Sequence, residues 1–427
     1  MKKAVLLLAM VTLIAGCIYL KNADKDTVLY GQQVEQDIQY AEVPEVEYTE
    51  EIISKAFTGE ADMADIVDVE PESVESVEEE VSEQERIDNG QITGVIYNEL
   101  TPDEQKIYAE ILNSLLAYEE ETPLSTTDSE LIDRAFSCVM LDHPEIFYVD
   151  GYKYTEYTRD DIVEKVVFTG KYLYGEEEII RRQNAIKEKT DGILANVPDT
   201  KDEYLKVKYL YDILVTQTEY DIHAEDNQNI CSVFLNGKSV CQGYAKAMQY
   251  LLNRLDIECS LVLGSVIGGE GHAWNLVSVN GAWYYLDVTW GDAFYLFGEE
   301  AIKAQSSIIN YDYLCVTTQQ LLLTHSLEMP VELPECVSMT DNYYVREGLY
   351  FTNYDSDKLQ YIFNRAIETG QETVTVKCSD NMVYDEMYRI LLDEQKIFEF
   401  MESDGTVAYT DNREQGILTF WLFEARY

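Results

Sequence analysis

The chain has 427 residues, and its 80 aspartates and glutamates outnumber 31 lysines and arginines, so the formal net charge is −49. Such acidity excludes electrostatic docking onto nucleic acid or anionic lipid, and it permits cationic partners such as amines or lysine-rich proteins. The length exceeds that of one ordinary domain, which predicts several folded units.

The first residues have the anatomy of an export signal. Two lysines are followed by an apolar run, residues 4–16, that is too short to span a bilayer. Residues 13–17 read LIAGC, which resembles the lipobox of bacterial lipoproteins. The resemblance implies a signal peptide over 1–17 and a lipid anchor on Cys17, at the outer face of the cytoplasmic membrane. The text DHPEIFY at 142–148 resembles a segment of Gram-positive surface lipoproteins, which implies a Gram-positive bacterium. A plain secretory signal or an uncleaved anchor is the alternative.

Residues 18–90 are predicted to form an acidic, disordered tether. Between Glu35 and Asp88 there are about twenty acidic residues, and the only bases are Lys55 and Arg86. High net charge with few large apolar residues does not compensate for the entropy lost on ordering. The alternative is a solvated acidic helix.

Residues 91–190 are predicted to form a small α/β module. Thr101-Pro102-Asp103-Glu104 is a capping box with proline at the first helical position, which predicts a helix through about residue 118. A second helix follows over 128–141, then two paired strands over 146–157 and 162–173. Helices over 176–195 and 201–216 lead into the next unit, which spans 191–328.

A β-hairpin is predicted around Asn280-Gly281, which lies between two apolar runs. A two-residue loop pairs Val279 with Ala282, and counting back places Trp274 opposite Asp287. Because side chains alternate between faces, His272, Trp274 and Asp287 share one face. His272 and Asp287 are then diagonal neighbours, so the carboxylate can accept a proton from one imidazole nitrogen.

Cys241 precedes a predicted helix over 242–255, where the dipole and free N–H groups favour a thiolate. Its own backbone N–H is a candidate oxyanion donor. Each of Cys241, His272 and Asp287 taken singly is explained as well by packing: a buried small thiol, a core histidine and a strand-end cap. Together, on fitting elements, they predict a Cys-His-Asp nucleophile system.

This part of the chain resembles a bacterial transglutaminase-like domain. The matching text is NGKSVCQGYA at 236–245, HAWN at 272–275 and WYYLDVTW at 283–290. The resemblance implies an α+β fold with a papain-like core, and it assigns the triad to Cys241, His272 and Asp287. Members of the family include cross-linking enzymes, peptidases, amidases and inactive relatives.

The sequence departs from animal transglutaminases in one respect. Those enzymes place a tryptophan on the oxyanion from a position before the cysteine, and here no tryptophan precedes Cys241. We therefore consider Gln242, Tyr220 and Trp274 as oxyanion or pocket residues. No ordered calcium-ligand spacing and no zinc spacing is present, so we predict neither a metal nor another cofactor.

Residues 329–427 are predicted to form a small accessory domain of βαβαββ order. Its strands are expected over 343–351, 373–378, 406–409 and 417–423, and its helices over 356–368 and 382–392. A helix-like stretch over 318–325 closes the preceding core. The six cysteines other than Cys17 and Cys241 are scattered on apolar elements, which favours buried thiols over disulfides. His143, His223 and His325 are interpreted as structural.

These features predict an extracytoplasmic, membrane-anchored thiol enzyme. His272 deprotonates Cys241, which attacks a carboxamide or peptide carbonyl, and water or an amine then resolves the thioester. The expected partner is a peptide or protein substrate in or outside the cell envelope. The alternative is a surface binding protein that keeps the fold with little or no turnover.

Overall fold

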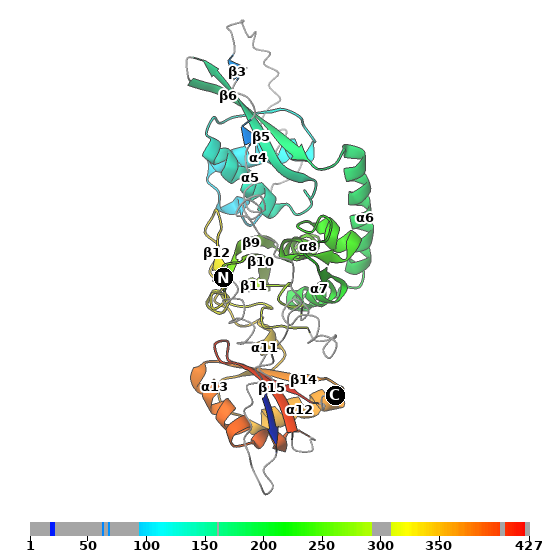
Figure 1. Ribbon diagram of the computed structural model, residues 1–427, viewed down its shortest axis with the longest axis vertical. Coiled ribbons are helices and arrows are strands. Elements are labelled where there is room, and N and C mark those ends of the chain that lie inside the picture. Colours follow the sequence, from blue (N-terminus) through cyan, green and yellow to red (C-terminus); the bar gives the residue numbers. More distant parts are fainter. Residues whose placement is uncertain are drawn as a thin grey trace, which may run out of the picture.

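The computed structural model describes residues 94–159, 162–292, 309–401 and 406–422, together with three short strands before residue 94. Their helices and sheets make an α+β protein, as predicted, and stack in three tiers along the long axis (Figure 1). Within these residues we find no helix of the length and apolarity that a membrane crossing requires.

The first tier packs two helices against an antiparallel sheet, and its elements begin close to their predicted positions. The Thr101–Glu104 capping box forms, with the Thr101 N–H donating to Glu104 Oε2 over 2.8 Å. The elements are η1 (Tyr97–Glu99), α4 (Pro102–Leu116), β4 (Thr122–Leu124), α5 (Ser129–Asp142), β5 (Val149–Arg159) and β6 (Ile162–Tyr172).

Three short strands fall inside the range predicted to be a tether. β1 (Ile18–Lys21) pairs with a strand of the third tier, and β2 (Asp62–Met63) and β3 (Val67–Asp68) pair with β5. At these positions the chain is paired rather than unstructured, since each strand caps a sheet edge that would otherwise expose N–H and C=O groups. The signal peptide, Cys17 and the rest of the predicted tether lie outside the described residues.

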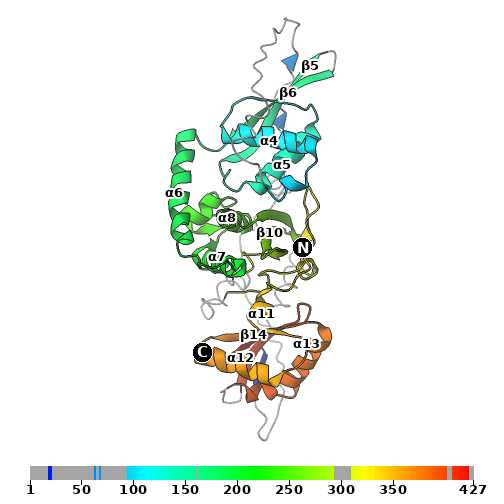
Figure 2. The same cartoon turned by 180° about the vertical axis from the view of Figure 1, so that it is seen from behind.

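The second tier holds the predicted hairpin. Figure 2 shows α6 running along one side of the molecule, from the first tier to the second. The helices of this tier and the segments between them are α6 (Glu176–Leu194), α7 (Glu203–Gln217), β7 (Glu219–Tyr220), the π-helix η2 (Ser232–Asn236), β8 (Lys238–Ser239), α8 (Cys241–Asn253) and α10 (Thr318–Leu321). Its main sheet has the order β11-β10-β9-β12 and comprises β9 (Cys259–Val266), β10 (Gly271–Val279), β11 (Ala282–Leu286) and β12 (His325–Leu327).

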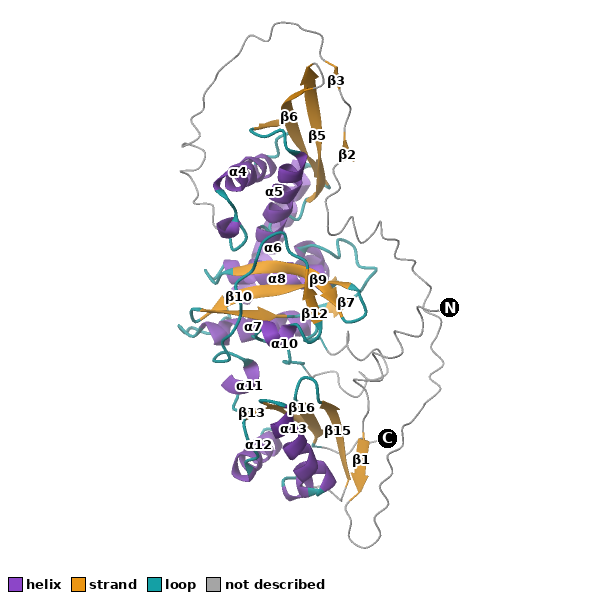
Figure 3. Cartoon of the chain, turned by 90° about the vertical axis from the view of Figure 1, so that its left-hand side faces the viewer, coloured by secondary structure: helices purple, strands orange, loops and turns teal. Residues whose placement is uncertain are grey.

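The central sheet is covered on both faces. Ala273 and Val277 of β10 pack toward α8, in a hydrophobic cluster that continues into the first tier. Trp274 and Leu276 face the opposite side, where they pack in a smaller cluster with Tyr313. Figure 3 shows α7 and α8 against this sheet. The alternation places His272, an even-numbered residue, on the side of Trp274.

The third tier has its own hydrophobic core and follows the predicted βαβαββ order. Its sheet has the order β1-β15-β16-β14-β13. The elements are α11 (Tyr343–Arg346), β13 (Tyr350–Phe351), α12 (Ser356–Glu368), β14 (Thr373–Cys378), α13 (Asn381–Tyr388), the π-helix η3 (Arg389–Asp393), η4 (Lys396–Glu399), β15 (Thr406–Asn412) and β16 (Ile417–Trp421).

Two element predictions were wrong. The expected strand over 343–351 begins as helix α11, because the Asn342 side chain accepts a hydrogen bond from the Tyr344 N–H and caps it, and only Tyr350–Phe351 is a strand. The expected helix over 318–325 ends at Leu321, and His325 begins β12 instead. Pairing of β12 with β9 is a non-local contact that local sequence patterns do not encode.

Candidate active site

Cys241 is the first residue of α8. Val240 before it is extended, with φ −108° and ψ 179°, so the chain passes from β8 into the helix at the cysteine. Cys241 is partly exposed, whereas the other six described cysteines are buried, and all seven are free thiols. The prediction of buried thiols is therefore confirmed for the described residues. The position combines access with the partial positive charge of a helix N-terminus.

Gly243 lets the first turn of α8 approach the segment before it. A Cβ on Gly243 would lie 1.9 Å from Ser239 Oγ and 2.9 Å from the Asn227 carbonyl oxygen. Ser239 Oγ is itself fixed, because it donates to the Asn227 carbonyl over 2.7 Å and lies 2.7 Å from Ser232 Oγ. The position of the cysteine thus depends on a glycine two residues after it.

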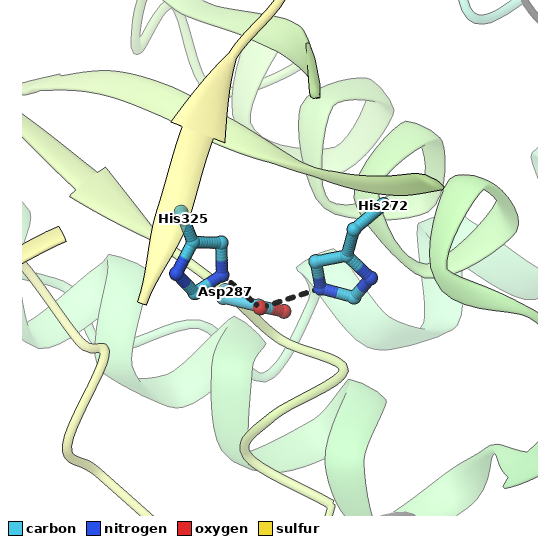
Figure 4. Close-up of side chains that lie close together, drawn as sticks. All are labelled: His272, Asp287 and His325. Carbon is cyan, nitrogen blue, oxygen red and sulfur yellow. Dashed lines mark hydrogen bonds and ion pairs between the residues drawn. The ribbon is translucent and has the colours of Figure 1, made fainter. Parts of the chain in front are cut away.

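His272 and Asp287 meet as the predicted register requires. Val279 pairs with Ala282 and Asn275 with Leu286, so Asp287, the residue directly after β11, comes opposite Trp274. His272 Nε2 lies 2.7 Å from Asp287 Oδ2, with both side chains buried (Figure 4). The Trp290 N–H donates to the other carboxylate oxygen over 3.1 Å. Asp287 is therefore held at both oxygens.

The electrostatics favour an ionised pair. Burial by itself lowers the pKa of His272, but the Asp287 carboxylate and the Cys241 side chain, which also hydrogen-bonds to the imidazole, raise the pKa to about 10. Burial likewise opposes ionisation of Asp287, yet the charge of His272 and hydrogen bonds from two histidines hold its pKa below the usual range. An imidazolium beside a carboxylate is the arrangement that stabilises a neighbouring thiolate.

Two tryptophans enclose the His272 ring. Trp274 stacks beside it, with centroids 5.9 Å apart, and Trp290 lies 6.0 Å away at a tilt. Trp274 is completely buried, so it shields the His272–Asp287 contact and does not offer a donor to a solvent-side pocket. Exclusion of water strengthens the interaction between the two charged groups.

The two other pocket candidates lie on the helix that begins at Cys241 and on the strand paired with β8 just before it. Gln242 is half-buried as the second residue of α8. Tyr220 is half-buried on β7, opposite Ser239 of β8, and stacks with Tyr244 at 6.5 Å. Their roles at the oxyanion stay predictions.

His325 is a member of the site that sequence reasoning missed. Its Nε2 lies 3.2 Å from Asp287 Oδ2, so two histidines converge on one carboxylate oxygen (Figure 4). The side chain is buried, and its ring packs edge-on against Trp274 at 4.8 Å. The expected position of His325 at a helix end was wrong, because His325 begins β12 and the pairing of β12 with β9 carries it to Asp287. No local sequence signal identifies that pairing.

The same three side chains present their ligand atoms within 4.8 Å of one another, which is compatible with a metal site. Their separations of 2.7 and 3.2 Å are hydrogen-bond distances, and the chemistry of each contact is satisfied by an imidazole N–H donating to a carboxylate. The cluster is therefore described fully as a hydrogen-bonded His272–Asp287 pair that a second histidine joins.

A cysteine at a helix start, a histidine on a strand and an aspartate after the next strand, on an α+β core, define a papain-like arrangement. Residues 192–288 match the family model of the transglutaminase-like superfamily, so this part of the chain is a transglutaminase-like core. The predicted resemblance is confirmed over these residues. No curated protein matches the chain significantly.

Solved structures of related description match about a third of the chain. One is a transglutaminase (15% identity, TM-score 0.24, 33% of this chain and 51% of that one). Another is a proposed cysteine protease from Cytophaga hutchinsonii, with 14% identity and a TM-score of 0.23. The match covers 32% of this chain and 62% of that one. A third is the periplasmic domain of TgpA from Pseudomonas aeruginosa bound to ethylmercury, with 15% identity and a TM-score of 0.21. The match covers 33% of this chain and 60% of that one. The chain thus spans about half to three fifths of these proteins.

Proposed function

We propose that this protein is a thiol enzyme of the transglutaminase-like class that acts on amide or peptide bonds through a thioester on Cys241. The observation that carries the proposal is the buried 2.7 Å contact between His272 Nε2 and Asp287 Oδ2. Because that contact occupies Nε2, the other imidazole nitrogen serves Cys241, whose side chain hydrogen-bonds to the ring. A histidine that served only packing would not need one ring nitrogen bonded to a carboxylate and the other bonded to a thiol.

The reaction runs in two stages. The Cys241 thiolate attacks the carbonyl carbon, and the negative charge that develops on the oxygen is stabilised by N–H groups at the start of α8. His272 then protonates the leaving ammonia or amine, and the acyl group remains on sulfur as a thioester. Water or a second amine attacks the thioester as the now neutral His272 removes its proton, and sulfur leaves as the thiolate, which regenerates the thiolate–imidazolium pair. Asp287 keeps the imidazole oriented and balances its charge in both stages.

Selective alkylation tests the nucleophile. Iodoacetamide near neutral pH should modify Cys241 faster than the six buried cysteines, and Cys138→Ala serves as the matched control because Cys138 is buried. His272→Ala should abolish the excess reactivity of Cys241. If Cys241 in the wild-type protein is modified no faster than the buried thiols, the proposal is wrong and a binding protein with this fold is favoured.

Product analysis identifies the reaction. Release of ammonia from glutamine-containing peptides, with incorporation of an added amine, would establish a cross-linking transferase. Ammonia without amine incorporation would establish an amidase, and backbone cleavage without ammonia would establish a peptidase. Cys241→Ser should abolish each of these activities, because a serine hydroxyl does not ionise at neutral pH and is a much poorer nucleophile than the thiolate.

The LIAGC text at 13–17 supports anchoring of the enzyme outside the cytoplasmic membrane through a lipid on Cys17. Metabolic labelling with palmitate in a Gram-positive host should label the wild-type chain. Cys17→Ala should lose the label and leave the membrane fraction. Retention of the label in Cys17→Ala would contradict the anchor.

A further inference from the structure

Asp287 is fixed by three N–H donors, and only one of them belongs to the predicted triad. Oδ1 accepts from the Trp290 backbone, and Oδ2 accepts from His272 and His325. A carboxylate can accept several such bonds, and each one favours its ionised form and limits its rotation.

Asp287 and Thr324 together favour one tautomer of His325. Its Oγ1 lies 2.8 Å from His325 Nδ1, closer than the 3.4 Å that separates it from the Leu321 carbonyl oxygen. Because Asp287 only accepts, His325 must present N–H at Nε2, and in the neutral ring Nδ1 then accepts from the Thr324 hydroxyl. Burial lowers the pKa of His325 most strongly, and the nearby charge of His272 lowers it further. The hydrogen bond to Asp287, the charge of Asp287 and a hydrogen bond to the Leu321 backbone oppose this shift without cancelling it.

The chain of hydrogen bonds continues to the third tier. Thr324 Oγ1 lies 2.7 Å from the Tyr313 hydroxyl, which in turn accepts from the side-chain amide of Gln415. Gln415 belongs to the turn between β15 and β16. Given a neutral His325, every donor along this chain points toward Asp287, and such aligned bonds strengthen one another.

We propose that His325, held as a neutral donor by Thr324, is a positioning residue that keeps Asp287 ionised and oriented toward His272. The inference rests on the proposed function, since its effect reaches Cys241 only through that pair. It also gives the accessory domain a role, because the donor chain begins at Gln415. The titratable groups that face the His325 ring are Asp287, His272 and Tyr313.

The test measures the rate of Cys241 alkylation by iodoacetamide against pH, using the full chain. His325→Leu removes the donor, whereas His325→Gln keeps an amide N–H near the place of Nε2. Loss of a hydrogen bond to a buried charge should slow alkylation at neutral pH about tenfold and move the acid limb of the profile to higher pH. His325→Gln should restore most of the rate and the profile, and His223→Leu at an exposed histidine is the matched control.

A second pair of variants acts on the tautomer with less risk to folding, because Thr324 is only half-buried. Thr324→Val removes the hydroxyl and should slow alkylation, and Thr324→Ser should not. If folded His325→Leu and Thr324→Val keep the wild-type alkylation rate and pH profile, the inference about His325 is wrong while the proposed function stands. The same holds if His325→Gln loses as much of the alkylation rate as His325→Leu. An unreactive Cys241 in the wild-type protein would instead overturn the proposed function.

Discussion

Gly264 of β9 lies opposite His272 of β10, and its missing side chain makes room for the indole of Trp274. A Cβ on Gly264 would lie 2.6 Å from Trp274 Cη2 and 1.9 Å from the backbone oxygen of Ser326. One glycine therefore allows both the shielding of His272 and the close pairing of β12, the strand that carries His325.

Gly264→Ala should displace β12 or the Trp274 ring, because the backbone oxygen of Ser326 has little freedom to move. We expect a loss of about 2 kcal/mol in the free energy of unfolding from this overpacking. Cys241 alkylation should slow with it. Urea denaturation and the alkylation rate check both expectations. Gly192→Ala is the control, since Gly192 lies in α6 with open space around it. Alanine at this helical position should raise the free energy of unfolding by about 0.5 kcal/mol.

Gly243→Ala should reduce the reactivity of Cys241 by tilting the first turn of α8. The new methyl group collides first with Ser239 Oγ, at 1.9 Å. Adding Ser239→Ala removes that atom, so the double variant should recover part of the lost rate, while the Asn227 carbonyl oxygen still limits the recovery. A double-mutant cycle on the alkylation rate measures the coupling. Purely additive effects would contradict the contact.

The stability of the protein should depend on His272 at alkaline pH. The pKa of this group is raised from its usual 6.5 to about 10 in the folded chain. Its contribution is therefore complete below pH 6.5 and is lost as the pH rises through about 10. The free energy of unfolding should fall less between pH 6.5 and 10 in His272→Gln than in the wild-type protein. Parallel pH curves for the two proteins would refute this assignment.

Gln415→Met should lower the Cys241 alkylation rate by about two- to threefold, because loss of one remote neutral hydrogen bond weakens the donor chain without breaking it. The measurement is the neutral-pH rate, with thermal unfolding to confirm that the third tier stays folded. Gln360→Met is the matched control, because the Gln360 side chain donates a hydrogen bond to Asn364 within α12. Equal Cys241 alkylation rates in Gln415→Met and Gln360→Met would show that the third tier does not influence the site.

Much of the second tier was predictable from the sequence. The Asn280-Gly281 turn set the hairpin register, and the register brought Asp287 to His272. The capping box at Thr101 and the start of α8 at Cys241 were also correct, because caps and turns act within a few residues. In the third tier, the limits of α12 and β14 agree with their apolar periodicity.

Other features required the tertiary structure. The four-residue helix α11 replaced an expected strand because one side-chain cap outweighed strand propensity. The sequence did not indicate that His325 contacts Asp287. It reaches Asp287 only when β12 joins the edge of the sheet beside β9.

The sequence by itself thus determined the positions of the candidate nucleophile Cys241 and of the His272–Asp287 pair, since these residues lie on elements whose geometry follows from local turns and helix starts. Only the tertiary structure decided that a second histidine shares that carboxylate and that a donor chain joins it to Gln415. Those contacts depend on long-range strand pairing and on packing between tiers, which no periodicity in a single segment specifies.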